Sequence, residues 1–244
     1  MRRVVWFSCG AASAVAAKLI VDRHASSCEV VYCDTLISEH PDNKRFLKEV
    51  EVWIGRKITI IKSDKFGSVD DVFEKTRYMS GIKGARCTVE MKKIPREKWQ
   101  KPNDIHVFGY TFDEVKRADT FEKNNPALDV EWVLIDEKID KHRCLAILSE
   151  AGIKLPEMYS LGFDHNNCLG CVKATSPKYW NKVRINFPSV FENRCVQSRL
   201  LGVKLVRFKG ERIFLDQLPP DADGPKEDIE CGPVCQTPSR SPNE

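Results

Sequence analysis

The sequence predicts an α/β fold: a doubly wound, mostly parallel sheet of five strands, followed by a small cysteine-containing appendage at the C-terminal end. Short apolar runs alternate with helical segments through residues 1–155, and such alternation forms right-handed crossovers in a parallel sheet. These runs consist of branched and aromatic residues, as is typical of strands buried on both faces. At 244 residues, of which 42% are hydrophobic, the chain can bury a core without disulfides.

The individual elements follow from local patterns. Strands are expected over residues 4–7, 29–33, 57–61, 105–109 and 130–135. Helices are expected over 14–23, 41–53, 69–78 and 140–151; Pro41 suits a first helical turn, and Gly152 is a C-terminal cap signal. Between them lies a Gly-rich loop carrying Gly81, Gly84, Arg86 and Cys87. A strand pair, 203–208 and 211–215, turns at Lys209–Gly210.

Three parts of the chain differ in character. Residues 1–155 are predicted to form the α/β domain, 156–235 a cysteine-cluster appendage packed on it, and 236–244 a disordered tail. The net charge of +4, with basic residues spread along the chain, indicates a solvated surface. Met1–Arg3 and the apolar run behind them resemble a secretory signal. The polar turn after residue 7 interrupts that run, so we expect a cytoplasmic protein without a membrane partner.

The carboxyl ends of the predicted strands carry the candidate binding residues. Ligands of parallel α/β sheets bind outside these ends, which places residues 8–13, 34–35 and 109–117 on one rim. The turn 8–13 joins a strand to a helix through small side chains, so that backbone amides and the helix N-terminus can approach an anion. It contains neither GxxxxGK[ST] nor GxGxxG. The alternative is an ordinary small-residue turn. The candidate contacts are Ser8, Cys9, Gly10, Ala11, Ala12, Ser13, Asp34, Thr35 and Gly109.

The turn resembles the PP-loop of Rossmann-like nucleotide-binding proteins, whose usual form is SGGxDS before a helix. This chain keeps Ser8, Gly10 and Ser13, but has Cys9 in place of the first glycine. Ala12 stands where the PP-loop has an acidic residue, which bears on how magnesium and pyrophosphate are handled.

Further segments resemble phosphoadenosine phosphosulfate (PAPS) reductases, over roughly residues 3–235. They are Asp34–Thr35; Arg86–Cys87–Thr88 with Lys92–Lys93 and Pro95; Gly109–Tyr110 with Glu114 and Arg117; and Glu230–Cys231–Gly232. The resemblance implies an adenine nucleotide, ATP or PAPS, with Mg²⁺. It also implies that Cys231 is catalytic. Arg86, Lys92 and Arg117 can neutralise phosphate or sulfate oxygens, and Glu114 can orient an arginine or a metal.

The cysteines form two close pairs. Cys168 and Cys171 make a CxxC, and Cys231 and Cys235 a CxxxC; two such pairs indicate a metal site, against the alternative of unpaired or disulfide-forming thiols. The position of Cys87 is similar to the layout of cluster-bearing adenylylsulfate reductases. That resemblance implies a [4Fe–4S] cluster on Cys87, Cys168, Cys171 and one tail cysteine, with Zn²⁺ as the other metal and Cys195 as a weaker substitute ligand. A helix N-terminus would make Cys9 reactive, so its role stays open.

Three functions follow as hypotheses. The first is a PAPS reductase-like enzyme, in which a tail thiolate attacks the sulfur of a phosphosulfate and a thioredoxin-type reductant resets the disulfide. The second is an ATP pyrophosphatase-type sulfurtransferase acting on a nucleic acid or base. The third is a zinc-stabilised nucleotide-sensing module without catalysis. A homodimer is compatible with each.

Overall fold

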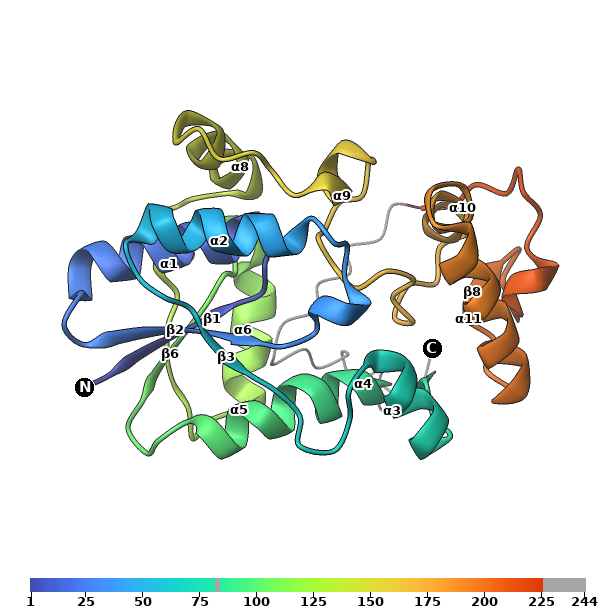
Figure 1. Cartoon of the computed structure of the whole chain (residues 1–244), viewed down its shortest axis with the longest axis horizontal. Helices are drawn as coiled ribbons and strands as arrows, with labels where there is room; N and C mark the ends of the chain where they lie inside the picture. Colours follow the sequence, from blue (N-terminus) through green and yellow to red (C-terminus); the bar gives the residue numbers. More distant parts are fainter. Residues whose placement is uncertain (82–83, 226–244) are drawn as a thin grey trace.

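The computed structural model describes residues 1–81 and 84–225. Its centre is a sheet of five parallel strands in the order β3-β2-β1-β6-β7, which confirms the predicted fold class (Figure 1). The strands are β1 (Arg3–Phe7), β2 (Cys28–Cys33), β3 (Thr59–Ile61), β6 (Ile105–Phe108) and β7 (Asp129–Glu131). Strand β1 lies in the middle, and Val4 and Val5 on it are fully buried because helices cover both faces of the sheet.

The two faces of the sheet have separate apolar cores. One face packs against α1 (Ala11–His24), α2 (Asn43–Ile54), α7 (Val133–Asp136) and α8 (Lys141–Glu150), through Phe7, Ile20, Phe46 and Leu148. The other face packs against α5 (Ile94–Trp99) and α6 (Val115–Asn124), with Trp6, Phe108 and Phe121 in its core. This is the doubly wound arrangement that the alternation of elements predicts.

A third apolar cluster lies beyond the carboxyl end of the sheet and forms the core of the right-hand part of Figure 1. It joins Val72 and Phe73 of α3 (Val69–Thr76) to Trp180 and Phe191. The other elements of this region are η1 (Leu36–Ser38), β4 (Ser80–Gly81), β5 (Gly84–Ala85), α4 (Arg86–Thr88), the π-helical turn η2 (Val89–Lys93), α9 (Glu157–Ser160), α10 (Pro177–Asn186), α11 (Pro188–Leu200), β8 (Val206–Phe208), β9 (Glu211–Ile213) and η4 (Leu215–Gln217). The cluster therefore contains residues from both sides of position 155. The domain boundary expected there stays a prediction.

Some expected elements are wrong in detail. The strand expected over 130–135 ends at Glu131, and residues 133–136 form α7 instead. From Arg86 the expected loop is helical, because α4, η2 and α5 follow one another to Trp99 and bury Met91. Helix α6, preceded by η3 (Phe112–Glu114), was not expected; its few apolar side chains, Ala118 and Phe121, lie three residues apart on one face.

The structure bears on the expected absence of a membrane span but not on the expected C-terminal motif and tail. Within residues 1–81 and 84–225, no helix is long and apolar enough to cross a bilayer. Cys231, Cys235, the ECG segment and the tail 236–244 lie outside the described residues.

Candidate functional site

The turn between β1 and α1 lies at the carboxyl end of the central strand, as the sequence predicts. Its shape depends on Ser13, whose hydroxyl accepts hydrogen bonds from the Ser8 amide (3.0 Å) and the Ser8 hydroxyl (3.1 Å). The same hydroxyl donates to the Gly10 carbonyl at 3.0 Å. Since Ser13 is 3% exposed and Ser8 is half-buried, Ser13 shapes the turn and Ser8 is the one placed to reach a ligand.

The N-terminus of α1 carries no side-chain cap. Gly10 occupies the capping position in an extended conformation (φ −108°) and, as a glycine, has no side chain that could cap the first helical amides. The Ala11 amide donates to the Tyr159 hydroxyl at 3.3 Å. A methyl group added at Gly10 would meet only the Ser8 and Tyr159 hydroxyls, at 3.6 and 3.7 Å, which is ordinary contact. The turn thus leaves space in front of a helix N-terminus, where the helix dipole favours an anion.

Gly109 lies directly against this helix end. A Cβ atom at Gly109 would be 2.6 Å from the Ser13 amide nitrogen and 2.7 Å from its Cα atom. Both atoms belong to the backbone, so a side chain at this position would displace either α1 or the end of β6. Packing alone therefore requires a glycine at position 109, which was predicted from the sequence as a binding residue.

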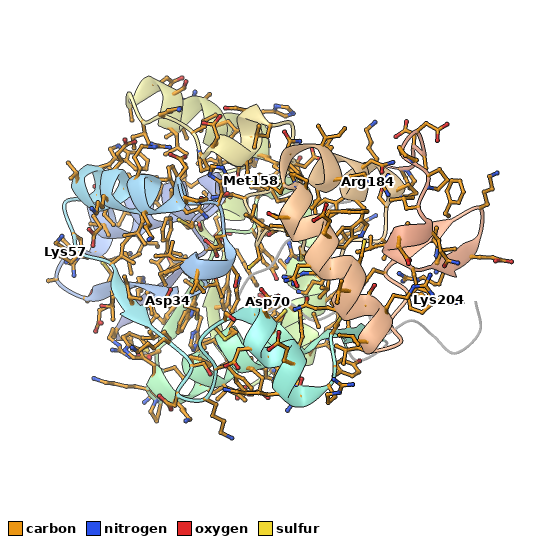
Figure 2. All side chains as sticks on the ribbon, turned by 45° about the vertical axis from the view of Figure 1, so that its right-hand side comes forward. Asp34, Lys57, Asp70, Met158, Arg184 and Lys204 are labelled. Carbon is orange, nitrogen blue, oxygen red and sulfur yellow. The ribbon has the colours of Figure 1, made fainter. Side chains whose placement is uncertain are left out.

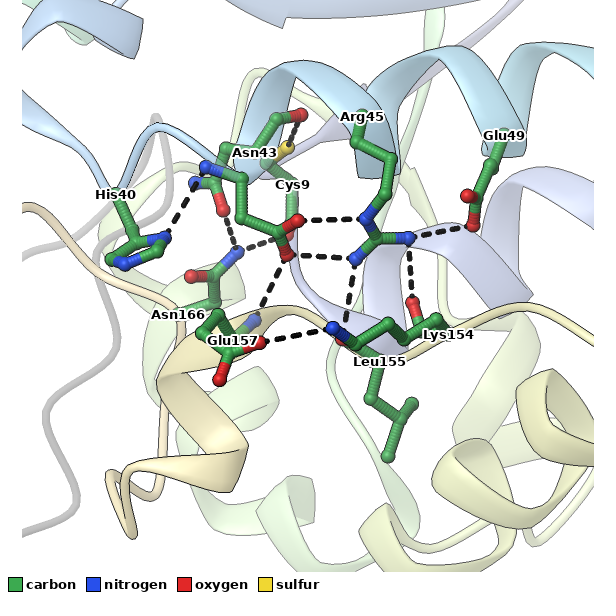
Figure 3. A network of polar contacts seen from close by, with 10 residues as sticks. Cys9, His40, Asn43, Arg45, Glu49, Lys154, Leu155, Glu157 and Asn166 are labelled. Carbon is green, nitrogen blue, oxygen red and sulfur yellow. Dashed lines mark hydrogen bonds and ion pairs between the residues drawn. The ribbon is translucent and has the colours of Figure 1, made fainter.

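A buried polar network supports the turn from behind (Figure 3). The Asn166 side-chain amide donates to the Cys9 carbonyl at 2.6 Å and to Asn43 Oδ1 at 2.7 Å. Asn43 Nδ2 in turn donates to Glu39 Oε2 at 2.6 Å, and the Thr35 hydroxyl donates to the other carboxylate oxygen of Glu39. Each of these side chains is less than a tenth exposed. The network connects the turn to the end of β2 and to the segment before the CxxC.

A second set of contacts in Figure 3 attaches the chain near α9 to the start of α2. Arg45 forms two hydrogen bonds with Asp42, both 2.7 Å, and also donates to the carbonyls of Lys154 and Leu155. The Asp42 carboxylate accepts from the Glu157 amide at 3.0 Å. The Arg45 guanidinium holds the pKa of Asp42 below its ordinary value, so this pair stays charged at neutral pH. Helix α9, which carries Tyr159, is thereby held over the turn.

Cys9 is not a reactive thiol in this environment. It is fully buried with φ 60°, and its thiol is 3.5 Å from the Asn43 carbonyl. Burial raises the pKa of the Cys9 thiol well above its ordinary value, and the carboxylates of Glu39 and Asp42 raise it further. Burial and these carboxylates favour the protonated thiol.

The other rim residues of β2 and β6 have defined partners. Asp34 Oδ1 accepts from the Leu36 amide at 3.2 Å, and Thr35 is 1% exposed. Glu114 forms an ion pair with Arg117 and accepts from the Thr111 amide at 3.1 Å, so it caps η3. The Arg117 guanidinium carbon lies 4.2 Å from the centre of the Tyr110 ring. Of the two partners expected for Glu114, an arginine or a metal, the structure shows an arginine, Arg117.

The basic residues of the helical stretch 86–99 lie in two environments. Arg86 is exposed, pairs with Glu90 at 2.6 Å, and lines a cavity of about 510 Å³ together with Thr76, Tyr78 and Val89. Lys92 is 7% exposed, and its carbonyl is 3.7 Å from the Cys33 thiol at the end of β2. Its charge is close enough to Cys9 to oppose the rise in that pKa. Lys92 is thus buried near Cys9 and Cys33, whereas Arg86 faces the cavity.

The CxxC is a tight, buried turn. Cys168 and Cys171 are 8% and 7% exposed, and Gly170 between them has φ 61°. The Cys171 amide donates to the Tyr179 hydroxyl at 2.8 Å. Cys87 packs against the same apolar cluster as Cys168. Among the described residues, no three His, Cys, Asp or Glu side chains are arranged as a metal-binding group, so these residues do not by themselves fit a cluster or zinc. The ligand set that includes Cys231 or Cys235 stays a prediction.

Four residues of the site were missed from the sequence: Glu39, Asn43, Tyr159 and Asn166. Asn43 follows the Pro41 that marks the start of α2, and Asn166 precedes the CxxC by two positions. Both are polar residues that the structure buries, but the sequence carries no signal for their burial.

The structure assigns the chain to a broad class: it is a doubly wound α/β protein with a small-residue turn at the end of its central strand. No protein family and no curated protein matches the sequence. Among solved structures, the chain is similar to a PAPS reductase from Candida auris in complex with phosphate, with a TM-score of 0.49 and 13% sequence identity. The match covers 68% of this chain and 80% of that one, and it says nothing about the residues of the site.

Proposed function

We propose that the protein is a PAPS reductase-like enzyme that binds an adenine nucleotide, PAPS or ATP, by its phosphates at the turn 8–13. The observation that carries the proposal is the N-terminus of α1, which has Gly10 in place of a capping side chain, only the Tyr159 hydroxyl on its first amide, and room for a further atom beside Gly10. Helix N-termini of this kind bind phosphates because their amides lack partners and the dipole favours negative charge.

Charged side chains around the turn support the proposal. Lys92 is buried and its charge acts on Cys9 of the turn, and Arg117 lies in α6, which follows the adjacent strand β6. Cations placed this way would neutralise phosphate or sulfate oxygens, and positioning together with charge neutralisation accounts for most of phosphoryl and sulfuryl transfer catalysis.

In the reductive reaction, the Cys231 thiolate attacks the sulfur of the phosphosulfate, an S–S bond forms, and the S–O bond to the adenosine bisphosphate breaks. A second thiolate then attacks the Cys231 sulfur and releases sulfite, and a thioredoxin-type dithiol reduces the resulting disulfide. The second candidate is ATP-dependent sulfur transfer to a nucleic acid, which the excess of basic residues over 173–212 favours. In that reaction the α-phosphate passes to an acceptor oxygen with loss of pyrophosphate, and sulfur then displaces AMP.

The test is a substitution that blocks the anion site without harming the fold. Gly10→Asp places a carboxylate where the phosphates would lie, yet aspartate is a favourable helix N-cap and φ −108° suits any residue. Gly10→Asn is the matched neutral control. Titrations would use PAPS, ATP and GTP, with folding checked by thermal melts.

We expect PAPS or ATP to bind the wild type, with GTP weaker, and Gly10→Asp to lose affinity by about tenfold or more relative to Gly10→Asn. Equal affinities of the two variants, or no saturable binding of any nucleotide to the wild type, would refute the proposal. ATP turnover to pyrophosphate separates the transferase from the reductase, and absence of any turnover leaves the nucleotide-sensing module.

A further inference from the structure

The charge of the chain is concentrated in one region. Residues 173–212 contain ten lysines and arginines against two acidic residues, a net charge of +8. The whole chain has a net charge of +4, with 39 basic and 35 acidic residues, so the rest of it is net negative by four. Basic residues occur along the whole chain, but their excess over acidic residues is confined to this segment. This region comprises α10, α11 and the β8–β9 hairpin, on the side of the molecule away from the sheet (Figure 1).

The hairpin presents its charges on one face. In its register, Arg207 pairs with Arg212 and Val206 with Ile213. Because side chains alternate across a strand, the arginines share the face opposite to Val206, which is fully buried. Both arginines are exposed. Lys209 forms the turn with Gly210, with φ values of 50° and 85°, and its side chain is exposed at the tip of the hairpin.

This arrangement is unfavourable for the hairpin alone, since like charges directly opposite each other destabilise an antiparallel pair. The base of the hairpin adds Lys204, which is exposed and lies at the same end of the molecule (Figure 2). Of the nearby acidic residues, Asp216 is bonded to Arg199 at 2.9 Å, and Glu211 is opposite Phe208 on the other face. A face with this charge is suited to a polyanion.

The shape of the surface indicates which polyanion. A two-stranded ribbon fits the major groove of B-form DNA, whereas the major groove of double-stranded RNA is too narrow to admit side chains. The two aromatic rings nearby are covered by cations of the chain itself. The Lys209 ammonium is 5.2 Å from the centre of the Phe208 ring, and the Arg199 guanidinium 4.0 Å from that of Phe214. These rings are therefore not offered for stacking with unpaired bases, as single-strand binders require.

We propose that the outer face of the β8–β9 hairpin, with Lys204 and Lys209, is a docking surface for duplex DNA, with the hairpin at the major groove and its cations on the flanking phosphates. The surface is built without any residue of the turn 8–13. Its test is therefore independent of nucleotide binding, and either proposal can fail without the other.

The experiment measures fluorescence anisotropy of the full chain with a labelled DNA duplex of about 20 base pairs, without nucleotide, at several salt concentrations. The main variant is Arg207→Glu with Arg212→Glu, which replaces one like-charged pair by another. The control is Lys57→Glu with Lys123→Glu, two exposed residues of the sheet domain that change the net charge equally; Lys57 lies on the opposite side of the molecule (Figure 2). Arg207→Glu alone creates an attractive cross-strand pair, so any loss of binding in it cannot come from a weakened hairpin.

We expect the double variant to lose about tenfold or more in affinity, and the slope of log K against log salt to become shallower by about 1.8, or 0.9 for each lost phosphate contact. The single variant should lose an intermediate amount and the control less than about twofold. Equal losses in the control, unchanged binding in the variants, tighter binding of double-stranded RNA or single-stranded DNA, or equal competition by polyglutamate would overturn the proposal.

Discussion

Replacing Gly109 by alanine tests how tightly the end of β6 is packed against the turn 8–13. The added Cβ atom would lie 2.6 Å from Ser13 N, 2.7 Å from Ser13 Cα and 3.0 Å from the carbonyl carbon of Ala12. All three are backbone atoms, so no change of side-chain rotamer relieves the overlap. Ordinary contacts begin at 3.4 Å, so helix α1 or strand β6 must move by several tenths of an ångström.

The expected cost follows from that displacement. Extra atoms in a well-packed core destabilise a protein by about 1–3 kcal/mol. Because the clash involves backbone on both sides, we expect Gly109→Ala to fall at the upper end of this range. Against a typical free energy of unfolding of about 5–15 kcal/mol, such a loss is readily measured.

Urea unfolding followed by tryptophan fluorescence gives the free energy, and Gly67→Ala is the matched control. Gly67 has no atom within 4 Å of an added Cβ and no positive φ, so alanine there should be neutral or stabilise by about 0.4–1 kcal/mol. If Gly109→Ala unfolds at the same urea concentration as Gly67→Ala, the close approach of β6 to α1 is not present in solution and the geometry of the turn is wrong.

Three further predictions concern buried polar groups. Burial lowers the pKa of His106 from 6.5 to about 4, so the unfolded chain binds a proton before the folded one as the pH falls. The free energy of unfolding of the wild type should therefore fall by about 2 kcal/mol between pH 7 and pH 5 through this group. Urea titrations of His106→Gln should lack that part of the loss. Asn166→Ala leaves the Cys9 carbonyl without its donor and should cost about 1–3 kcal/mol, against no loss for the exposed Asn193→Ala; equal stabilities would show that the network contributes nothing. Iodoacetamide at neutral pH should leave Cys9 unmodified in the native protein and modify it in urea, as mass spectrometry can report; modification of Cys9 in the native state would contradict its raised pKa.

The sequence by itself determined the sheet and the position of the turn. Apolar runs, small residues after the first strand and the spacing of strands and helices are local signals, and local signals suffice for strand β1, helix α1 and the rim on which Ser8, Asp34 and Gly109 lie. They failed where tertiary contacts decide the conformation, as in α6 and in the helix that begins at Arg86.

Only the tertiary structure decided which rim residues support the turn and which remain accessible. Asn166 contacts Cys9 across 157 positions of the chain, and Tyr159 reaches Ala11 across 148. No periodicity encodes such pairs, because they depend on how α9 and the CxxC segment pack over the carboxyl end of the sheet. The same holds for the basic hairpin: its charges are visible in the sequence, but the folding of residues 206–213 places Arg207 opposite Arg212 on one exposed face.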